Sequence, residues 1–376
     1  MIYLDHNATT PVDSRVFAAM EPYLTRAFGN PSSVHSAGRE ARRAVELARE
    51  KVAALIGAED PEEIVFTSGG TESDSLALSH LRSSEPGSAI VTTAVEHPAV
   101  AESARRLEAE GHAWRVIPVE PSGGMDLDAV RRALSPAPAL VSVMAANNEY
   151  GAIFPVAEVA AMARSLGASV HCDAVSALGR LPIDVRSLGV DFLSISAHKI
   201  HGPKGTGALY VRRGIDLAAV FPGGGQERRR RGGTENVAGI VGFGEAAGFM
   251  AREGEASRAK LARLRDRFES EVSTRFRQTR IWGSEVARLP NTSAIAFPGS
   301  SGESLLIALD LAGVAVSVGS ACSSGTLTPS PSILALGASR DEARSTLRFS
   351  FGKDNRENEI PPVIEALSAA VGRGRA

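Results

Sequence analysis

The chain has 376 residues, 43% of them hydrophobic, which is enough for a large core and suggests about two domains. Its 41 Lys and Arg residues nearly balance its 43 Asp and Glu residues, so the charge favours neither nucleic acid nor an anionic membrane as a partner. The first ten residues are too polar for a signal peptide, and no apolar run reaches ~18 residues, so we expect a cytoplasmic protein.

The first long periodic segment covers residues 36–57. Apolar residues recur there at helical spacing as far as Ile56, and Ser36 is the expected N-cap. Four charged residues fall between the apolar positions, and we expect them on the solvent-exposed face: Arg42, Glu46, Arg49 and Glu50. The segment therefore predicts an amphipathic helix with one buried face.

Short β-rich runs alternate with helical segments over the next 150 or so residues. The runs are 62–67, 89–95, 114–119, 139–145, 168–173, 191–197 and 207–213. Helical segments such as Pro98–Glu110 and Val156–Leu166 separate several of them. This alternation is typical of βαβ units, so we predict an α/β fold with a mostly parallel seven-stranded sheet covered by helices.

The pattern changes towards the C-terminus. The elements expected there are helices at Glu235–Arg252 and Glu255–Arg275, a strand at 292–297, a helix at 302–313, a strand at 345–351 and a final helix. Their order predicts a second, smaller α+β domain. We therefore expect a large domain at residues 14–250 and a small domain formed by residues 1–13 and 251–376.

The segment SGGTES (68–73) follows the first strand of the predicted sheet and precedes a helix. Small residues such as Gly70 let the backbone approach a ligand closely, and Thr71 adds a hydroxyl to the free N–H groups of the helix N-terminus. A phosphate-binding site is one interpretation, and an ordinary glycine-rich turn with a threonine cap is the other.

Polar side chains also follow two later strands of the predicted sheet. Asp173 ends the run 168–173, and Ser196, His198 and Lys199 lie at the end of the run 191–197. Ligands of open α/β sheets bind at the carboxyl ends of the strands, so we expect these residues in one site with the SGGTES turn. Pyridoxal 5'-phosphate needs this set: a lysine for the Schiff base, a carboxylate facing the pyridinium nitrogen, and ligands for the phosphate.

Three more residues are candidates for the same site. His97 can stack on an aromatic ring or move protons near neutral pH, and a structural histidine is the alternative. Asn148 can bind a cofactor hydroxyl or a substrate carboxylate, or it is a turn residue. Arg348 can hold a carboxylate with two N–H groups, or it forms a surface ion pair. We single out no metal ligands.

The two cysteines have contrasting surroundings. Cys172 lies in a predicted strand beside Asp173, so we expect it to be buried like a small hydrophobic side chain. Cys322 lies in SVGSACSSGT, where glycine and serine surround it without apolar periodicity. We therefore predict a mobile loop with an accessible thiol, and a thiolate there is a potential nucleophile.

Taken together, these motifs resemble the cysteine desulfurases of the nitrogen-fixation and iron–sulphur-assembly type. That family belongs to the class V aminotransferases, within the fold-type I (aspartate aminotransferase-like) pyridoxal-phosphate enzymes. The resemblance covers nearly the whole chain. Its motifs, in order, are YLDHNATTP, FGNPSSVH, EIVFTSGGTES, EHPAV, NNEYG, HCDAV, SAHKIHGPKG, RGGTENV, GSACSSGTLTPS and LRFSFG.

The resemblance implies a role for each candidate in binding pyridoxal phosphate. Lys199 carries the cofactor as a Schiff base, Asp173 faces the ring nitrogen and His97 stacks on the ring. The phosphate ligands are Thr71, with its neighbour Gly70, Ser196 and His198. Ser176 stands where the family often has a glutamine that bonds the ring hydroxyl.

The resemblance also implies a substrate and partners. L-Cysteine, held through its carboxylate by Asn148 and Arg348, is converted to L-alanine, and its sulphur passes to Cys322 as a persulfide. A sulphur-acceptor protein, such as an iron–sulphur scaffold, then takes the sulphur. Thr234 reaches the phosphate bound in the partner subunit, which implies a homodimer with shared sites.

Two alternatives stay open on the sequence alone. The first is another enzyme of the same fold, such as a selenocysteine lyase or a small aminotransferase. The second is a catalytically silent relative that binds the cofactor and serves as an interaction subunit. Cys322 favours the desulfurase, because transamination needs no loop thiol.

Overall fold

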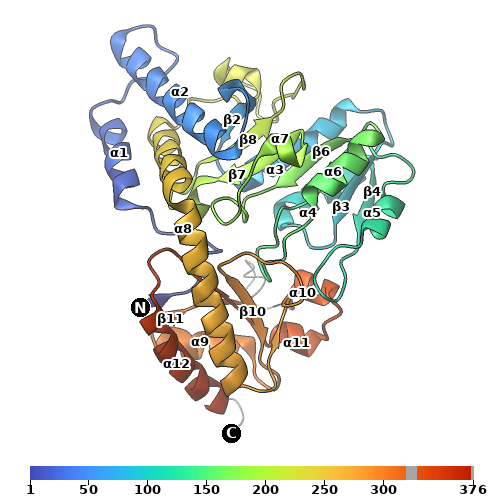
Figure 1. Cartoon of the computed structure of the whole chain (residues 1–376). Helices are drawn as coiled ribbons and strands as arrows, with labels where there is room; N and C mark the ends of the chain where they lie inside the picture. Colours follow the sequence, from blue (N-terminus) through green and yellow to red (C-terminus); the bar gives the residue numbers. More distant parts are fainter. Residues whose placement is uncertain (319–327, 374–376) are drawn as a thin grey trace.

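A large sheet and a smaller one lie towards opposite ends of one long helix, α8 (Val237–Arg275), which is gold in Figure 1. The computed structural model describes residues 1–318 and 328–373. The N-terminus lies beside the smaller sheet, in the same half of the molecule as the last helix, α12 (Ile360–Arg373). Segments from both ends of the chain therefore contribute to the smaller half.

Within the described ranges the large sheet has seven strands. In sheet order they are β2 (Ile64–Thr67), β8 (Gly207–Val211), β7 (Phe192–Ser196), β6 (Ser169–Asp173), β5 (Leu140–Ser142), β3 (Ala89–Thr93) and β4 (Ala113–Ile117). Strand β8 runs antiparallel to both of its neighbours, and the other pairs are parallel. The predicted mostly parallel seven-stranded sheet is confirmed.

Helices cover both faces of this sheet because its strands carry apolar side chains on both faces. Alternate residues of β2 show this: Phe66 packs into one hydrophobic cluster and Val65 into another. The first cluster includes residues of α2, α6 and α8, and the second includes residues of α3 and α4. The helices of this half, besides α8, are α1 (Ser14–Thr25), α2 (Ser36–Ile56), α3 (Gly70–Leu78), α4 (Pro98–Ala109), α5 (Leu127–Ala133), α6 (Val156–Ser165) and α7 (Val185–Leu188).

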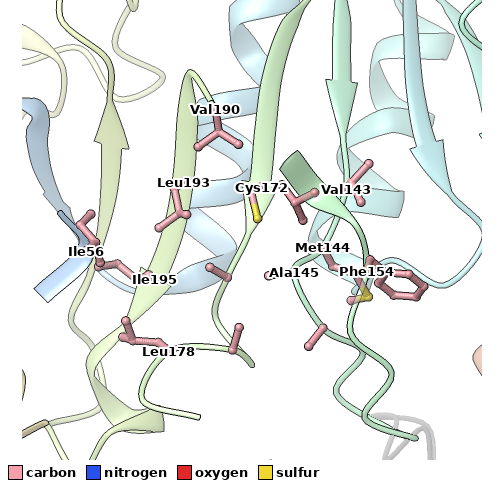
Figure 2. Packing of buried hydrophobic residues seen from close by; sticks show 14 of the residues in the cluster. Ile56, Val143, Met144, Ala145, Phe154, Cys172, Leu178, Val190, Leu193 and Ile195 are labelled. Carbon is pink, nitrogen blue, oxygen red and sulfur yellow. The ribbon is translucent and has the colours of Figure 1, made fainter. Parts of the chain in front are cut away.

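Cys172 lies inside the first of these clusters. Figure 2 shows its sulphur between Leu193 of β7 and Val143, which directly follows β5, and no part of its side chain reaches solvent. Burial raises the pKa of the Cys172 thiol well above its usual value. The prediction of a buried cysteine is therefore confirmed, and a neutral, enclosed thiol is unreactive.

Helix α2 departs from its prediction in two details. Its N-cap is His35, whose Nδ1 accepts a hydrogen bond from the Gly38 N–H, so the prediction of Ser36 as the cap is wrong. Arg49 is buried, not exposed, and its guanidinium makes two hydrogen bonds of 2.8 and 2.9 Å with the buried Glu227 carboxylate. The ion pair explains the burial, because an unpaired charge there would be costly.

The two helices expected at Glu235–Arg252 and Glu255–Arg275 are one helix of 39 residues, so that prediction is wrong. Gly254 lies between the two expected ranges, but a glycine inside a helix costs only about 1 kcal/mol. Burial of apolar residues on both sides of it, such as Phe243 and Phe268, outweighs that cost. Despite the length of α8, no helix in the described part of the chain is long and apolar enough to span a membrane.

The smaller half contains an antiparallel sheet, with four strands among the described residues, and a parallel two-stranded pair. The four strands, in sheet order, are β12 (Ser317–Val318), β13 (Thr346–Ser350), β10 (Thr292–Ala296) and β9 (Arg280–Ile281), and the pair is β1 (Ile2–Tyr3) with β11 (Val314–Ala315). The helices here are α9 (Gly302–Leu311), α10 (Pro331–Ala335), α11 (Arg340–Arg344) and α12. This confirms the smaller α+β unit.

We propose that residues 14–250 form one domain, and that residues 1–13 and 251–376 form the other. A separate hydrophobic cluster supports this division, because its described members come from Leu4 and from residues after 260. The proposed boundary falls within α8, so this helix is shared by the two domains.

Candidate active site

The carboxyl ends of the parallel strands meet at one edge of the large sheet, as expected for an α/β fold. A cavity of about 340 Å³ lies there. The predicted residues that line it are Gly70, Thr71, His97, Asn148, Asp173, Ser176, His198, Lys199 and Arg348. Tertiary structure thus brings together residues from opposite ends of the sequence.

Lys199 ends a short 3-10 turn, η3 (Ala197–Lys199), directly after β7. Its ammonium donates hydrogen bonds to the backbone carbonyls of Asn7 and Ala8, the latter at 3.1 Å. Burial lowers the pKa of Lys199 to about 7, and the positive charges of Arg180 and Arg348 act in the same direction. A lysine with this pKa is available as a neutral nucleophile near physiological pH.

Asp173 ends β6 and its carboxylate is buried at the base of the cavity. One oxygen accepts a hydrogen bond of 2.9 Å from the Val175 N–H, which fixes its direction. Burial raises the pKa of Asp173, the nearby Asp74 raises it further, and His97 opposes the increase. A positively charged group placed beside this carboxylate would therefore be strongly favoured.

The turn between β2 and α3 forms a cradle of small residues. Gly69, which has φ of 155°, is the N-cap of α3 and has no side chain to cap the helix. A Cβ on Gly207 would lie only 2.6 Å from Gly69 Cα, so this close approach needs glycine at position 207, whereas the positive φ favours glycine at position 69. The first N–H groups of α3 are thereby left for an anion.

Ser196 provides a second feature of the same cradle. Its side chain is buried, and its Oγ has no hydrogen-bond partner among the described residues. A Cβ built on Gly69 would lie 4.0 Å from this oxygen, which places the hydroxyl at the start of α3. An unpaired buried hydroxyl beside an uncapped helix N-terminus fits an anionic group such as a phosphate.

His97 is the N-cap of α4 and has a defined protonation pattern. Its Nδ1 accepts a hydrogen bond of 3.1 Å from the Ala99 N–H, so the proton of the neutral ring lies on Nε2. Burial lowers the pKa of His97, and Lys199 lowers it further, whereas Asp173 raises it. The ring lines the cavity as a neutral group suited to stacking and to proton transfer through Nε2.

Arg348 enters the cavity from β13 of the small sheet. It is buried, and its guanidinium donates to Asp5 Oδ1 at 2.8 Å and to the backbone carbonyl of Asn148 at 3.1 Å. Its Nε has no partner among the described residues. The alternative of a surface ion pair is therefore wrong, because Arg348 lines the cavity and its ion pair with Asp5 is largely buried.

The remaining predicted residues have different positions. His198 lines the cavity, and its Nδ1 lies 3.1 Å from Thr9 Oγ1. Ser176 also lines it, with its carbonyl accepting from Arg180. Thr234 is exposed and is not part of this cavity wall. Cys322 lies outside the described residues.

Sequence reasoning assigned no role to several residues that contribute to the site. Asn7 and Ala8 hold the Lys199 side chain, Asp5 pairs with Arg348, and Asp74 lines the cavity. The polar segment YLDHNATTP was a usable signal, since it contains a carboxylate and an amide close together in a short strand-like region. Its approach to Lys199 depends on contacts between residues almost 200 positions apart.

The fold and the site together define a class of protein. A nucleophilic lysine, a buried carboxylate at the end of a neighbouring strand and an anion cradle at a helix N-terminus are the parts required to bind pyridoxal phosphate. The unpaired Ser196 hydroxyl and the cradle of glycines fit its phosphate group. The molecule is thus built as a pyridoxal-phosphate enzyme of the aspartate aminotransferase-like fold.

Comparison with known proteins narrows this class. The family model for class-V aminotransferases matches residues 2–363. A cysteine desulfurase of Sinorhizobium fredii is 47% identical over 376 residues, covering 100% of this chain and 97% of the relative. The cysteine desulfurase IscS of Dictyoglomus turgidum is 43% identical, with coverage of 100% and 95%.

Solved structures agree with these sequence relatives. A NifS-like protein superposes with a TM-score of 0.92 at 35% identity and covers 99% of both chains. The structure of SspA in complex with cysteine has a TM-score of 0.83 at 33% identity, covering 94% of this chain and 99% of the other. The chain belongs to the class-V aminotransferase family and, within it, to the cysteine desulfurases.

Proposed function

We propose that this protein removes sulphur from L-cysteine, releases L-alanine and transfers the sulphur to its own Cys322. The observation that carries the proposal is the cavity in which Lys199, Asp173 and the start of α3, at Gly70 and Thr71, meet Arg348. Lys199, Asp173 and the start of α3 suit the cofactor, and Arg348 suits the carboxylate of an amino acid. The full-length similarity to cysteine desulfurases supports L-cysteine as the amino acid.

Different residues of the site would bind the cofactor and transfer protons. Pyridoxal phosphate, when bound, supplies an electron sink that stabilises negative charge at the substrate Cα. The Asp173 carboxylate would hold positive charge on the ring nitrogen, and the helix α3 N-terminus with Thr71 and Ser196 would hold the phosphate. Lys199 Nζ, whose pKa is lowered to about 7, would accept the Cα proton and return it.

Two residues of the wall would orient the substrate. The guanidinium of Arg348 already forms directed hydrogen bonds to Asp5 and to the Asn148 carbonyl, so its plane is fixed before the substrate arrives. The Arg348 guanidinium and the Asn148 side chain, which both line the cavity, would bind the substrate carboxylate. The His97 Nε2–H faces the same space and would exchange a proton with the reacting groups.

The sulphur transfer needs no external oxidant. The Cys322 thiolate would attack the substrate sulphur, so that a sulphur–sulphur bond forms as the Cβ–sulphur bond breaks. The electron pair of the broken bond remains on the carbon skeleton, which gains protons and leaves as alanine. The balanced products are L-alanine and a persulfide on Cys322.

Comparing the two cysteines tests the proposal. We expect the purified protein to make alanine from L-cysteine and to gain one sulphur atom on Cys322 by mass spectrometry. Cys322→Ala should lose both the persulfide and most alanine formation. Cys172→Ala is the matched control and should keep both, because Cys172 is enclosed in the core.

Absence of alanine formation by the wild type would refute the proposal, as would full turnover by Cys322→Ala. The same assay with L-selenocysteine distinguishes a desulfurase from a selenocysteine lyase, since a lyase needs no persulfide on Cys322. A keto-acid acceptor in the assay would reveal an aminotransferase.

We also propose a cytoplasmic homodimer that delivers the persulfide sulphur to an acceptor protein such as an iron–sulphur scaffold. Thr234 supports the dimer, because it is exposed and lies outside the cavity of its own chain, where it is free to reach a partner. The exposed apolar side chains of Phe17 and Phe28 also suit an interface. The near-zero net charge supports protein and small-molecule partners over nucleic acid or membrane.

A further inference from the structure

Arg180 is a buried cation close to the active-site Lys199. Its guanidinium donates one hydrogen bond of 2.9 Å to the Ser176 carbonyl and another of 2.9 Å to the His6 carbonyl. Only 5% of the residue is exposed, and it has no carboxylate partner within the described part of the chain. Burying a guanidinium without an ion-pair partner is costly, so its retention here calls for a functional reason.

Its hydrogen bonds join the two segments that build the lysine site. Ser176 lies in the turn directly after Asp173, and His6 precedes Asn7, whose carbonyl accepts from Lys199 Nζ. Arg180 and Lys199 also line the same small cavity, of about 30 Å³, which Asp173 does not line. Arg180 therefore lies near Lys199 but does not line the main cavity.

The positive and negative charges that act on Lys199 cancel when Lys199 itself is a neutral amine. Arg180 and Arg348 supply two positive charges, and Asp173 and Asp5 supply two negative charges. A proton on Lys199 would add an uncompensated charge to a buried site, where solvent screens it weakly. If the residue at position 180 were neutral, a protonated Lys199 and Arg348 would together balance the negative charges of Asp173 and Asp5, so the protonated lysine would be favoured.

We propose that Arg180 is a positioning residue whose fixed positive charge keeps Lys199 as a free amine. The free amine is the form that condenses with the cofactor aldehyde: its lone pair attacks the carbonyl carbon, a carbon–nitrogen bond forms and water leaves. Arg180 thereby sets the lower pH limit for loading the enzyme. This inference rests on the proposed function only in its cofactor, pyridoxal phosphate.

Other groups around Lys199 do not produce this effect over the neutral and alkaline range. The pKa values of His6, His198 and His201 are lowered to about 3, 4 and 4, mainly by burial, so these rings stay neutral. Burial lowers the pKa of His97 as well. Lys353 is paired with Asp13, which leaves it little net influence on Lys199.

Burial also raises the pKa of Asp173 to about 6 and that of Glu96 to about 8, so midpoints are compared only between variants in which both carboxyls are unchanged. Asp74 calls for its own control. It lines the main cavity, and burial raises its pKa to about 7, so it titrates in the same range as Lys199. The measurements are therefore repeated in an Asp74→Asn background. A shift that persists there belongs to the lysine.

Burial lowers the pKa of Arg180 to about 10, so the test stays below that value, where the guanidinium is charged. It measures how fast apo-protein combines with pyridoxal phosphate between about pH 6 and pH 9, by the absorbance of the lysine-bound cofactor. For the wild type we expect a rate that rises with pH, with a midpoint near 7. In Arg180→Met, which removes the charge, the midpoint should rise by about 1 pH unit. In Arg180→Lys, which keeps the charge, it should stay near the wild-type value.

A second variant separates charge from structural damage. Asp5→Asn removes a negative charge near Lys199, so its midpoint should move downward, opposite to that of Arg180→Met. Damage to the fold would instead slow the reaction at every pH without opposite shifts. If Arg180→Met does not fold, the downward shift of Asp5→Asn still tests the charge balance.

Equal midpoints in wild type and Arg180→Met would overturn the inference, as would an unchanged or upward shift in Asp5→Asn. These results would leave the proposed function intact, because the cofactor still binds. Failure of wild-type protein to combine with pyridoxal phosphate at any pH would refute both proposals.

Discussion

Ser196 offers a direct test of the proposed phosphate cradle. Its buried Oγ has no hydrogen-bond partner in the described residues, and it lies at the N-terminus of α3. Ser196→Ala removes this oxygen without breaking a protein hydrogen bond. We therefore expect the unfolding free energy of the apo-protein to change by less than about 0.5 kcal/mol.

Binding of pyridoxal phosphate should respond much more strongly. A hydrogen bond to a charged group contributes about 1.5–3 kcal/mol. Since 1.4 kcal/mol corresponds to a factor of ten, the dissociation constant of the cofactor should rise about 10- to 150-fold. Fluorescence titration of the apo-protein with pyridoxal phosphate measures this change, and urea unfolding measures the stability.

Ser194 is the matched control, two residues earlier on the same strand. It is equally buried, but its Oγ lies 2.9 Å from His171 Nε2. Ser194→Ala should destabilise the apo-protein by about 1–3 kcal/mol, because it leaves the histidine without this partner. A Ser196→Ala variant that behaves like Ser194→Ala in stability, with unchanged cofactor affinity, would refute the cradle.

Two further predictions concern stability. Glu227→Gln removes the buried counter-charge of the Arg49 guanidinium, leaves it only the more exposed Glu46 carboxylate at 3.1 Å, and should cost about 3 kcal/mol in urea unfolding. Glu102→Gln breaks an exposed ion pair and should cost less than about 0.5 kcal/mol, so equal losses would contradict the argument. The pKa of Lys199 falls from its usual 10.5 to about 7 on folding, so between these pH values the unfolded chain binds more protons. The unfolding free energy of apo wild type, relative to Lys199→Met, should therefore rise with pH by up to about 1.4 kcal/mol per unit, and a flat difference would exclude the lowered pKa.

Much of the large domain was predictable because its information is local. Each strand is a short run of β-branched and apolar residues, and such runs become parallel strands when helices cover both faces. The chemistry at the strand ends was also visible, since Asp173 and Lys199 are charged residues directly after apolar strands. Their assembly into one site follows from the parallel order of the strands.

The errors occurred where distant residues changed the local preference. Arg49 has the spacing of an exposed residue, but Glu227, 178 positions later, makes its burial favourable. The continuity of α8 across Gly254 likewise depends on packing against two separate cores. The left-handed backbone of Glu227 and Arg228 could not be read from residue type either, because tertiary contacts hold it.

The sequence by itself determined the elements, the mostly parallel sheet and the residue types needed for pyridoxal-phosphate chemistry. Spacing and residue type decide these features, and both are local properties of the chain. Only the tertiary structure decided the electrostatics of the site. The Asp5–Arg348 pair, the carbonyls that hold Lys199 and the buried charge of Arg180 act across long separations. The charge state of Lys199 depends on how many charges are buried beside it, and that number exists only once the chain has folded.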